Sequence, residues 1–97
     1  MSAYIIGRVE ITNWPRYLDY MRYTPGIIAR HGGKFVARCG ETDTLEGATE
    51  TMRVILLEFP DVDHARAFYH SQEYQEAKKL RDGAALAQFV MVDGCMS

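Results

Sequence analysis

The sequence is poor in the features that define several large classes of protein. Two cysteines in 97 residues are too few for a disulfide framework, and no Cys-x-x-Cys pair indicates a zinc site. The longest strictly aliphatic run, residues 54–57, is far shorter than the roughly 20 residues that span a bilayer. Lys and Arg number 11 against 13 Asp and Glu, so no basic excess points to nucleic acid. We therefore expect neither a membrane protein nor a nucleic-acid-binding protein.

The motifs of common cofactor-dependent and hydrolytic enzymes are also absent: there is no Gly-x-Gly-x-x-Gly, Walker loop or Gly-x-Ser-x-Gly. The three histidines, His31, His64 and His70, lack the close spacing of metal ligands. We expect no metal and no cofactor, with haem held by one of these histidines as a weaker alternative. Cys39 and Cys95 fall on opposite edges of the sheet predicted below, so both are expected to be free thiols. The first residues show no signal peptide, and a cytoplasmic location is expected.

What remains is a chain of one domain's length, residues 1–97, whose apolar periodicity changes along the sequence. Apolar residues alternate with others in residues 3–11, 34–40, 52–59 and 87–93, which predicts four strands. Helical spacing separates the first strand from the second and the third from the fourth. The chain is thus expected to alternate strands and helices in the order β-α-β-β-α-β.

Capping residues mark the ends of the two predicted helices. The first helix is capped by Asn13, is kinked or restarts at Pro25, and stops at Gly32 or Gly33. The second begins after an aspartate at position 61 or 63 and breaks at Ser71, which caps its second segment. The sequence therefore predicts a helical region in two pieces before the last strand.

This order is the ferredoxin-like α+β pattern. It places both helices on one face of a four-stranded antiparallel sheet with strand order 4-1-3-2. The helix-covered face is expected to carry the fully apolar sets, namely Ile5, Val9, Phe35, Ala37, Ile55, Leu57 and Phe59. Gly7 is expected to let a helix approach the sheet closely.

The opposite face of the predicted sheet mixes apolar and charged side chains. It is expected to carry Tyr4, Ile6, Arg8, Glu10, Val36, Arg38, Val54, Leu56 and Glu58. Its apolar members are too many to leave exposed, so a second copy of the chain is predicted to cover them in a symmetric homodimer. The charges on this face then need partners, water or a ligand.

Some of these charged side chains allow both a structural and a functional interpretation. A hairpin turn centred near residue 48 places Arg38 opposite Glu58, either as an ion pair of the dimer interface or as a pair that orients a polar substrate. His31 suits a helix C-terminus, where the dipole favours its charged form, and also an acid–base role. Tyr74 fits an apolar stripe, and Arg81 fits a helix C-terminus.

Several segments resemble those of the DUF1330 family and together span nearly the whole chain. They are RHGGKF at residues 30–35 with Arg38 and Gly40, LEFP at 57–60, ARAFY at 65–69 with SQEYQEA at 71–77 and Arg81, and VMVDG at 90–94. Cys39 and the polar stretch 41–51 depart from the pattern. The resemblance implies a dimeric α+β barrel, in which two ferredoxin-like subunits pack sheet to sheet, and it implies no particular reaction. The superfamily includes cofactor-independent monooxygenases, lactone isomerases, haem-degrading enzymes and ligand-sensing domains.

The resemblance and the open sheet face together define a candidate site. The family's polar positions are His31, Arg38, Glu58, Ser71, Tyr74 and Arg81. We assign His31 and Glu58 as catalytic groups that move a proton, and Arg38, Arg8, Ser71, Tyr74 and Arg81 as substrate-binding groups. The predicted function is to bind a small organic molecule in an inter-sheet or sheet–helix cavity of the homodimer, with or without cofactor-independent catalysis. The alternative is a non-catalytic ligand-binding or stress-related dimeric module.

Overall fold

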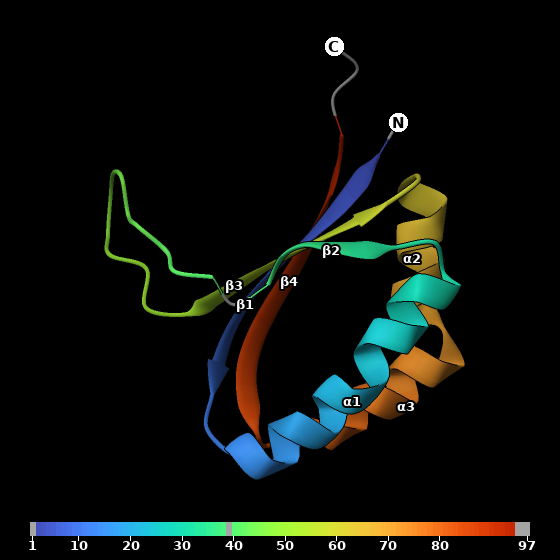
Figure 1. The fold of residues 1–97 in the computed structure, drawn as a ribbon, viewed down its shortest axis with the longest axis horizontal. Helices are drawn as coiled ribbons and strands as arrows, with labels where there is room; N and C mark the ends of the chain where they lie inside the picture. The colour runs from blue at the N-terminus through green and yellow to red at the C-terminus, as the bar shows by residue number, and fades with distance from the viewer. Residues whose placement is uncertain (1, 39, 95–97) are drawn as a thin grey trace.

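The strands form one antiparallel sheet, and the helices cover one of its faces (Figure 1). The computed structural model describes residues 2–38 and 40–94. The elements in these ranges are β1 (Ala3–Ile11), α1 (Trp14–Arg30), β2 (Lys34–Arg38), β3 (Arg53–Phe59), α2 (Val62–His70), α3 (Gln72–Leu80) and β4 (Ala85–Asp93). The strand order β2-β3-β1-β4 confirms the predicted order and the ferredoxin-like fold. The predictions about Cys39 and Cys95 lie outside the described residues.

The helices begin and end close to the predicted capping residues. The Asn13 side chain accepts a hydrogen bond from the Arg16 amide at 3.3 Å at the start of α1. Gly32 follows the end of α1 with a φ of +80°, a left-handed conformation that glycine adopts without strain. Of the two alternatives predicted at Pro25, a kink or a restart, the restart is wrong, because α1 is a single element from Trp14 to Arg30 that includes the proline.

The second helical region is divided as predicted. The Asp61 side chain accepts a hydrogen bond from the His64 amide at 2.8 Å and starts α2. The Ser71 hydroxyl accepts one from the Tyr74 amide at 3.1 Å and starts α3. These two caps allow the chain to turn between α2 and α3 while both helices still face the sheet.

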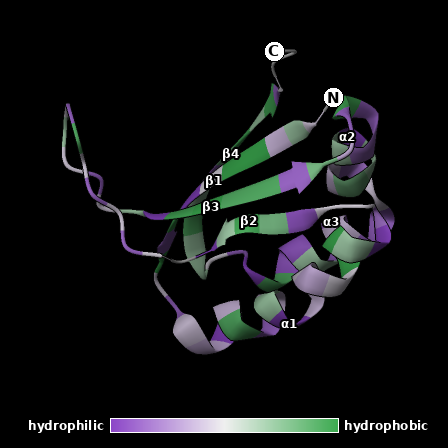
Figure 2. Ribbon diagram, turned by 45° about the horizontal axis from the view of Figure 1, so that its top comes forward, coloured by the Kyte–Doolittle hydropathy of each residue, from purple (hydrophilic) through white to green (hydrophobic). Residues whose placement is uncertain are grey.

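The core lies between the sheet and the helices. Strand residues predicted to face the helices are buried, including Ile5, Val9, Leu57 and Phe59, each with at most 4% of its surface exposed. In Figure 2 hydrophobic residues dominate β3 and β4. The prediction that Gly7 admits a helix is wrong, because its missing side chain makes room for the ring of Phe89 on the neighbouring strand.

A β-bulge in β2 changes the faces of two residues. Lys34 pairs with Glu58 and Phe35 with Leu57, but Ala37 then pairs with Leu56 and Arg38 with Ile55. The extra residue moves every later side chain of the strand to the other face of the sheet. The predicted placements of Ala37 on the helix face and Arg38 on the open face are therefore wrong.

The predicted Arg38–Glu58 pair is wrong because the hairpin is centred near residue 46, midway between the paired residues Lys34 and Glu58, and not near residue 48. Lys34 takes the place opposite Glu58, and its Nζ lies 3.5 Å from Glu58 Oε1. The bulge adds a further shift of one residue, so that Arg38 lies opposite Ile55.

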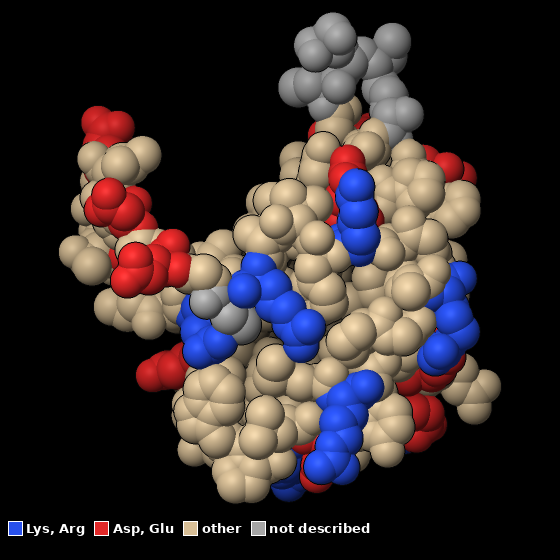
Figure 3. Space-filling model, in the orientation of Figure 1, with Lys and Arg blue, Asp and Glu red and all other residues tan. Residues whose placement is uncertain are grey.

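The connection between β2 and β3 projects from the sheet as a long loop (Figure 1). Its tip contains Gly47 at a φ of +90°, next to the predicted centre of the hairpin turn near residue 48. Acidic side chains gather along it (Figure 3), and Leu45 is 91% exposed. Glu50, at its base, returns to the sheet and pairs with Arg8.

Candidate functional site

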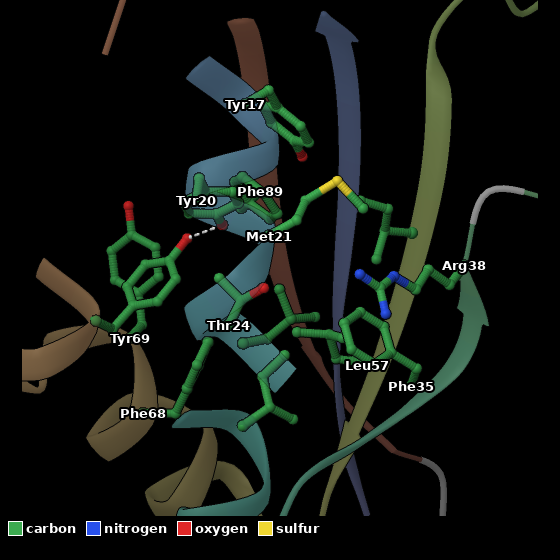
Figure 4. Close-up of a pocket in the computed structure, with 14 residues that line it drawn as sticks. Tyr17, Tyr20, Met21, Thr24, Phe35, Arg38, Leu57, Phe68, Tyr69 and Phe89 are labelled. Atoms are coloured by element: carbon green, nitrogen blue, oxygen red, sulfur yellow. Dashed lines mark hydrogen bonds between the residues drawn. The ribbon is translucent and has the colours of Figure 1, made fainter. Parts of the chain in front are cut away.

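A pocket lies between α1 and the helix-covered face of the sheet (Figure 4). Its walls come from every strand and helix. They are formed by Ile5, Tyr17, Tyr20, Met21, Thr24, Ile28, Phe35, Arg38, Ile55, Leu57, Phe68, Tyr69, Tyr74 and Phe89. We call this space the α1 pocket. It encloses about 540 Å³ including its open mouth, of which only about 40 Å³ admits the centre of a water molecule. It is therefore a narrow slot, and a ligand must be flat or must displace flexible side chains.

Of the residues that the structure describes, Arg38 is the one charged residue that lines the α1 pocket. The β2 bulge turns it toward the helices, and Figure 4 shows its guanidinium directed into the pocket from the strand. The guanidinium carbon lies 4.4 Å from the centre of the Phe35 ring, which holds it by a cation–π contact. Among residues 2–38 and 40–94, no acidic residue lines the pocket, so the charge of Arg38 faces this space with no carboxylate of that part of the chain in the pocket wall.

Two buried tyrosines form a polar group in the pocket wall. The hydroxyl oxygens of Tyr20 and Tyr74 lie 2.8 Å apart in a hydrogen bond, and the two residues are 6% and 2% exposed. Burial raises the pKa of the Tyr20 hydroxyl far above its ordinary value, and Tyr74 raises it further. Tyr20 therefore stays protonated and remains a hydrogen-bond donor.

Arg81 lies directly behind this tyrosine pair. Its guanidinium carbon is 5.4 Å from the Tyr20 ring centre and 5.1 Å from that of Phe89. Burial acts to lower the pKa of Arg81, but the oxygens of Tyr74 and Tyr20 raise it by more, so the pKa stays above its ordinary value. Its Nε is buried and makes no hydrogen bond within the described residues. A permanent positive charge thus stands behind the phenol groups of the pocket wall.

The two predicted catalytic groups lie outside the α1 pocket and apart from each other. His31 follows α1, and its Nε2 lies 3.3 Å from an oxygen of Glu73. Glu58 belongs to the open face of the sheet, where Tyr4 donates to it at 3.2 Å. Hydrogen bonds from Ser2 and Tyr4, together with Lys34, lower the pKa of Glu58. The structure therefore does not bring His31 and Glu58 together.

The predicted substrate-binding residues divide into two sets. Arg38 and Tyr74 line the α1 pocket, and Arg81 backs it through Tyr20. Arg8 instead makes a two-pronged ion pair with Glu50 on the open face, with both N–O distances 2.6 Å. Ser71 caps α3, and its hydroxyl donates to the Phe68 carbonyl oxygen at 2.7 Å.

Several pocket residues were not among the predicted site residues. Tyr17, Tyr20 and Thr24 recur at helical spacing on the inner side of α1, and Phe89 crosses over Gly7 from β4. The helical spacing is visible in the sequence, but it is equally typical of a solid core. Among residues 2–38 and 40–94, no three His, Cys, Asp or Glu side chains gather in a way that would hold a metal ion. In the same part of the chain, no helix is long and apolar enough to cross a membrane.

The sheet order and the one-sided helices define a ferredoxin-like α+β protein. Within that class, the chain belongs to the family described as "Domain of unknown function (DUF1330)", which matches residues 2–95. None of the curated proteins matches the sequence.

Solved structures with this fold include both uncharacterised proteins and an enzyme. RPA0582, a protein of unknown function from Rhodopseudomonas palustris, is 22% identical with a TM-score of 0.77, over 99% of this chain and 84% of that chain. SnoaB, a cofactor-independent oxygenase from Streptomyces nogalater, is 13% identical with a TM-score of 0.68, over 99% and 95%. A dimeric ferredoxin-like protein of unknown function from Jannaschia sp. CCS1 is 15% identical with a TM-score of 0.68, over 95% and 98%. At these identities the similarity shows the fold alone.

Proposed function

We propose that this protein is a homodimer in which each subunit binds a small, flat organic anion in its α1 pocket. The observation that carries the proposal is Arg38, which the β2 bulge turns into an aromatic slot with no acidic residue among its described wall residues. A guanidinium in such a place is available to a ligand, because no carboxylate of the pocket neutralises it.

The walls of the α1 pocket favour an aromatic or otherwise unsaturated ligand body. Half of the 14 lining residues are Phe or Tyr. Ring faces pack well against flat π systems, and a narrow apolar slot excludes bulky or strongly hydrated molecules. Met21 lies in the same wall, and its flexible side chain is suited to making room for a ligand. A planar guanidinium such as that of Arg38 matches the geometry of a carboxylate. The favoured class is therefore an aromatic carboxylate.

The open face of the sheet supports the homodimer. Leu86, Val90 and Val92 of β4 are 63%, 49% and 45% exposed there. Val90 pairs with Ile6 of β1, and Ile6 pairs in turn with Leu56 of β3, so the apolar surface extends across the sheet. Exposed apolar patches of this kind mark interaction surfaces, and a self-complementary face produces a two-fold dimer. One structure with the same fold is described as dimeric.

We propose binding, rather than proton transfer by His31 or Glu58, as the function of the α1 pocket. Neither of these residues lines the pocket, so a bound molecule would not contact them there. A solved structure of the same fold belongs to a cofactor-independent oxygenase, and an enzyme that used this chain's pocket would act on the same class of ligand. Binding is therefore the step to test first.

The test is calorimetric titration with benzoate and with benzamide, its neutral isostere. The unaltered protein is expected to bind benzoate at least about tenfold more tightly, because one good charge-assisted contact contributes about 1.4 kcal/mol or more. Arg38→Gln is expected to remove the preference. Arg53→Gln is the matched control: Arg53 also stacks on an aromatic ring, Trp14, with its guanidinium carbon 5.0 Å from the ring centre, but it does not line the pocket.

Two results would overturn the proposal. One is that a panel of aromatic carboxylates, including naphthoates and cinnamate, gives no binding to the folded protein. The other is that Arg38→Gln binds benzoate as tightly as the unaltered protein does. Arg38 is exposed at the mouth of the pocket, so its replacement is expected to leave the fold intact, and circular dichroism checks this.

A further inference from the structure

We propose that the inner end of the α1 pocket binds a second oxygen of the ligand and favours its ionised form. The ligand class is then an aromatic hydroxy acid, or an enol acid of similar shape. This inference rests on the proposed function, because it presupposes that the acid group lies at Arg38. It adds a second group of residues that recognises the ligand, formed by Tyr20, Tyr74 and Arg81. It also predicts that the bound molecule ionises more readily than the free one.

Counting hydrogen-bond donors at the tyrosine pair supports the first part. Tyr20 and Tyr74 carry two hydroxyl protons, and the 2.8 Å bond between their oxygens uses one of them. The neighbouring Arg81 has only donors, so it cannot accept the second proton. Both tyrosines line the α1 pocket, so an acceptor there, such as a ligand oxygen, completes the group.

The distribution of charge supports the second part. Arg38 faces the pocket directly, Arg81 stands behind Tyr20, and no Asp or Glu lines the space. In Figure 4, Arg38 and Tyr20 lie on opposite sides of the pocket. A ligand with an acid group at one end and an oxygen at the other would therefore meet a positive charge or a donor at each end. In a low-dielectric site such charges favour the ionised form of a bound acid.

Arg81 acts in this scheme as a positioning residue. It lies behind the tyrosine pair and does not line the pocket. By donating toward the tyrosine oxygens it turns the remaining hydroxyl proton toward the ligand, and its charge strengthens that donor.

The chemical change is an ionisation: the O–H bond of the ligand breaks and water accepts the proton. The resulting oxyanion accepts the tyrosine hydrogen bond, and no oxidant or reductant takes part.

The experiment uses 4-hydroxy-3-nitrobenzoate, whose phenolate absorbs visible light where the protein is transparent. Its phenol is titrated free and bound to the full-length protein, and benzoate, which lacks the second oxygen, is titrated calorimetrically in parallel. In the unaltered protein, the phenol pKa of the bound probe is expected to fall by at least about one unit, a tenfold change in the ionisation constant. Tyr74→Phe and Arg81→Gln are each expected to remove most of that shift.

Tyr69→Phe is the matched control. Tyr69 also lines the α1 pocket, but its hydroxyl accepts a hydrogen bond from Lys78 at 3.0 Å and is not bonded to the tyrosine pair. This variant also loses one pocket hydroxyl, yet it is expected to keep the full pKa shift. If Arg81→Gln fails to fold, Arg81→Lys and Tyr20→Phe test the same group, with the lysine expected to retain part of the shift.

The outcomes separate this inference from the proposed function. Benzoate binding that depends on Arg38, together with an unshifted phenol pKa, overturns the inference and leaves the proposed function standing. A shift that survives Tyr74→Phe and Arg81→Gln but is lost in Arg38→Gln also overturns it, because the oxyanion would then lie at the mouth. The absence of any benzoate binding overturns both.

Discussion

The two faces of the sheet differ in whether their positively charged side chains have acidic partners. On the open face, Arg8 is held by both oxygens of Glu50, and Lys34 lies beside Glu58. On the helix-covered face, Arg38 enters an aromatic pocket that no carboxylate lines in the described part of the chain. Both faces come from the same alternating strands. A neutralised charge belongs to an interface or to the fold, whereas an unneutralised charge in a slot is available for a ligand.

The apolar residues of the two faces differ in a parallel way. Phe59 and Leu57, under the helices, are 1% and 4% exposed, while Leu86 and Val90 on the open face are 63% and 49% exposed. The apolar side chains of the covered face are buried within one chain and stabilise its fold. Those of the open face stabilise the protein only when a second surface covers them, so the two faces should respond differently to the same kind of substitution.

The largest expected effect is therefore on the covered face. Phe59→Ala removes a ring that packs on Phe68 at 5.2 Å between centroids and lies against Gly33. Such a truncation in a core costs about 3–5 kcal/mol of unfolding free energy. Urea denaturation measures it. Leu86→Ala is the control on the open face, and in the monomer it should change the unfolding free energy by less than about 0.5 kcal/mol. Equal losses from the two variants would contradict the division into a covered and an open face.

A smaller effect is expected when charge is placed on the open face. Val90 pairs with Ile6 on the open face and is half exposed there, where a partner sheet would cover it. Val90→Asp would bury an unpaired carboxylate in a dimer, and we expect the dissociation constant to rise at least about 100-fold, or about 2.7 kcal/mol. Analytical ultracentrifugation measures the dissociation constant. Gln88→Asp is the comparison, because Gln88 lies on the same strand but accepts a hydrogen bond from Arg8.

Retention of the folded monomer is part of that prediction. Val90 is half exposed within one chain, so circular dichroism of Val90→Asp should match that of the unaltered protein. A dimer that forms with unchanged affinity would place the interface elsewhere. A chain that is monomeric before any substitution would leave the open face without a second copy.

The faces of the sheet could be predicted from the sequence wherever the strands are regular. Alternation placed Ile5, Leu57 and Phe59 under the helices, and capping side chains marked where the helices begin. Arg38 could not be placed, because the bulge in β2 depends on how the strand pairs with β3 and leaves no period in the sequence. The α1 pocket was missed for a related reason. Its aromatic residues have the spacing of a core, and only the packing shows that they leave a slot.

The smallest expected effect concerns the ion pair between Arg8 and Glu50. The hydrogen bond from Arg8 lowers the pKa of Glu50 in the folded protein below its value in the unfolded chain. The ionised pair therefore contributes stability above the unfolded pKa of about 4.5, and that contribution is lost as pH falls through the lower folded pKa. Glu50→Gln should therefore remove this part of the pH dependence of stability. The accompanying loss of unfolding free energy should be small, because both side chains are close to solvent.

Urea denaturation midpoints at pH 7 and at pH 3 measure the effect. Glu50→Gln should lower the midpoint slightly at pH 7 and by less at pH 3, because a larger fraction of the Glu50 carboxyl is protonated at pH 3 and the ion pair then contributes less. Glu46→Gln, an exposed position on the same loop, is the control and should show no such pH dependence. If Glu50→Gln lowered the midpoint equally at both pH values, Glu50 would stabilise the protein by packing and not by its charge. The ion pair that distinguishes Arg8 from Arg38 would then contribute nothing to stability.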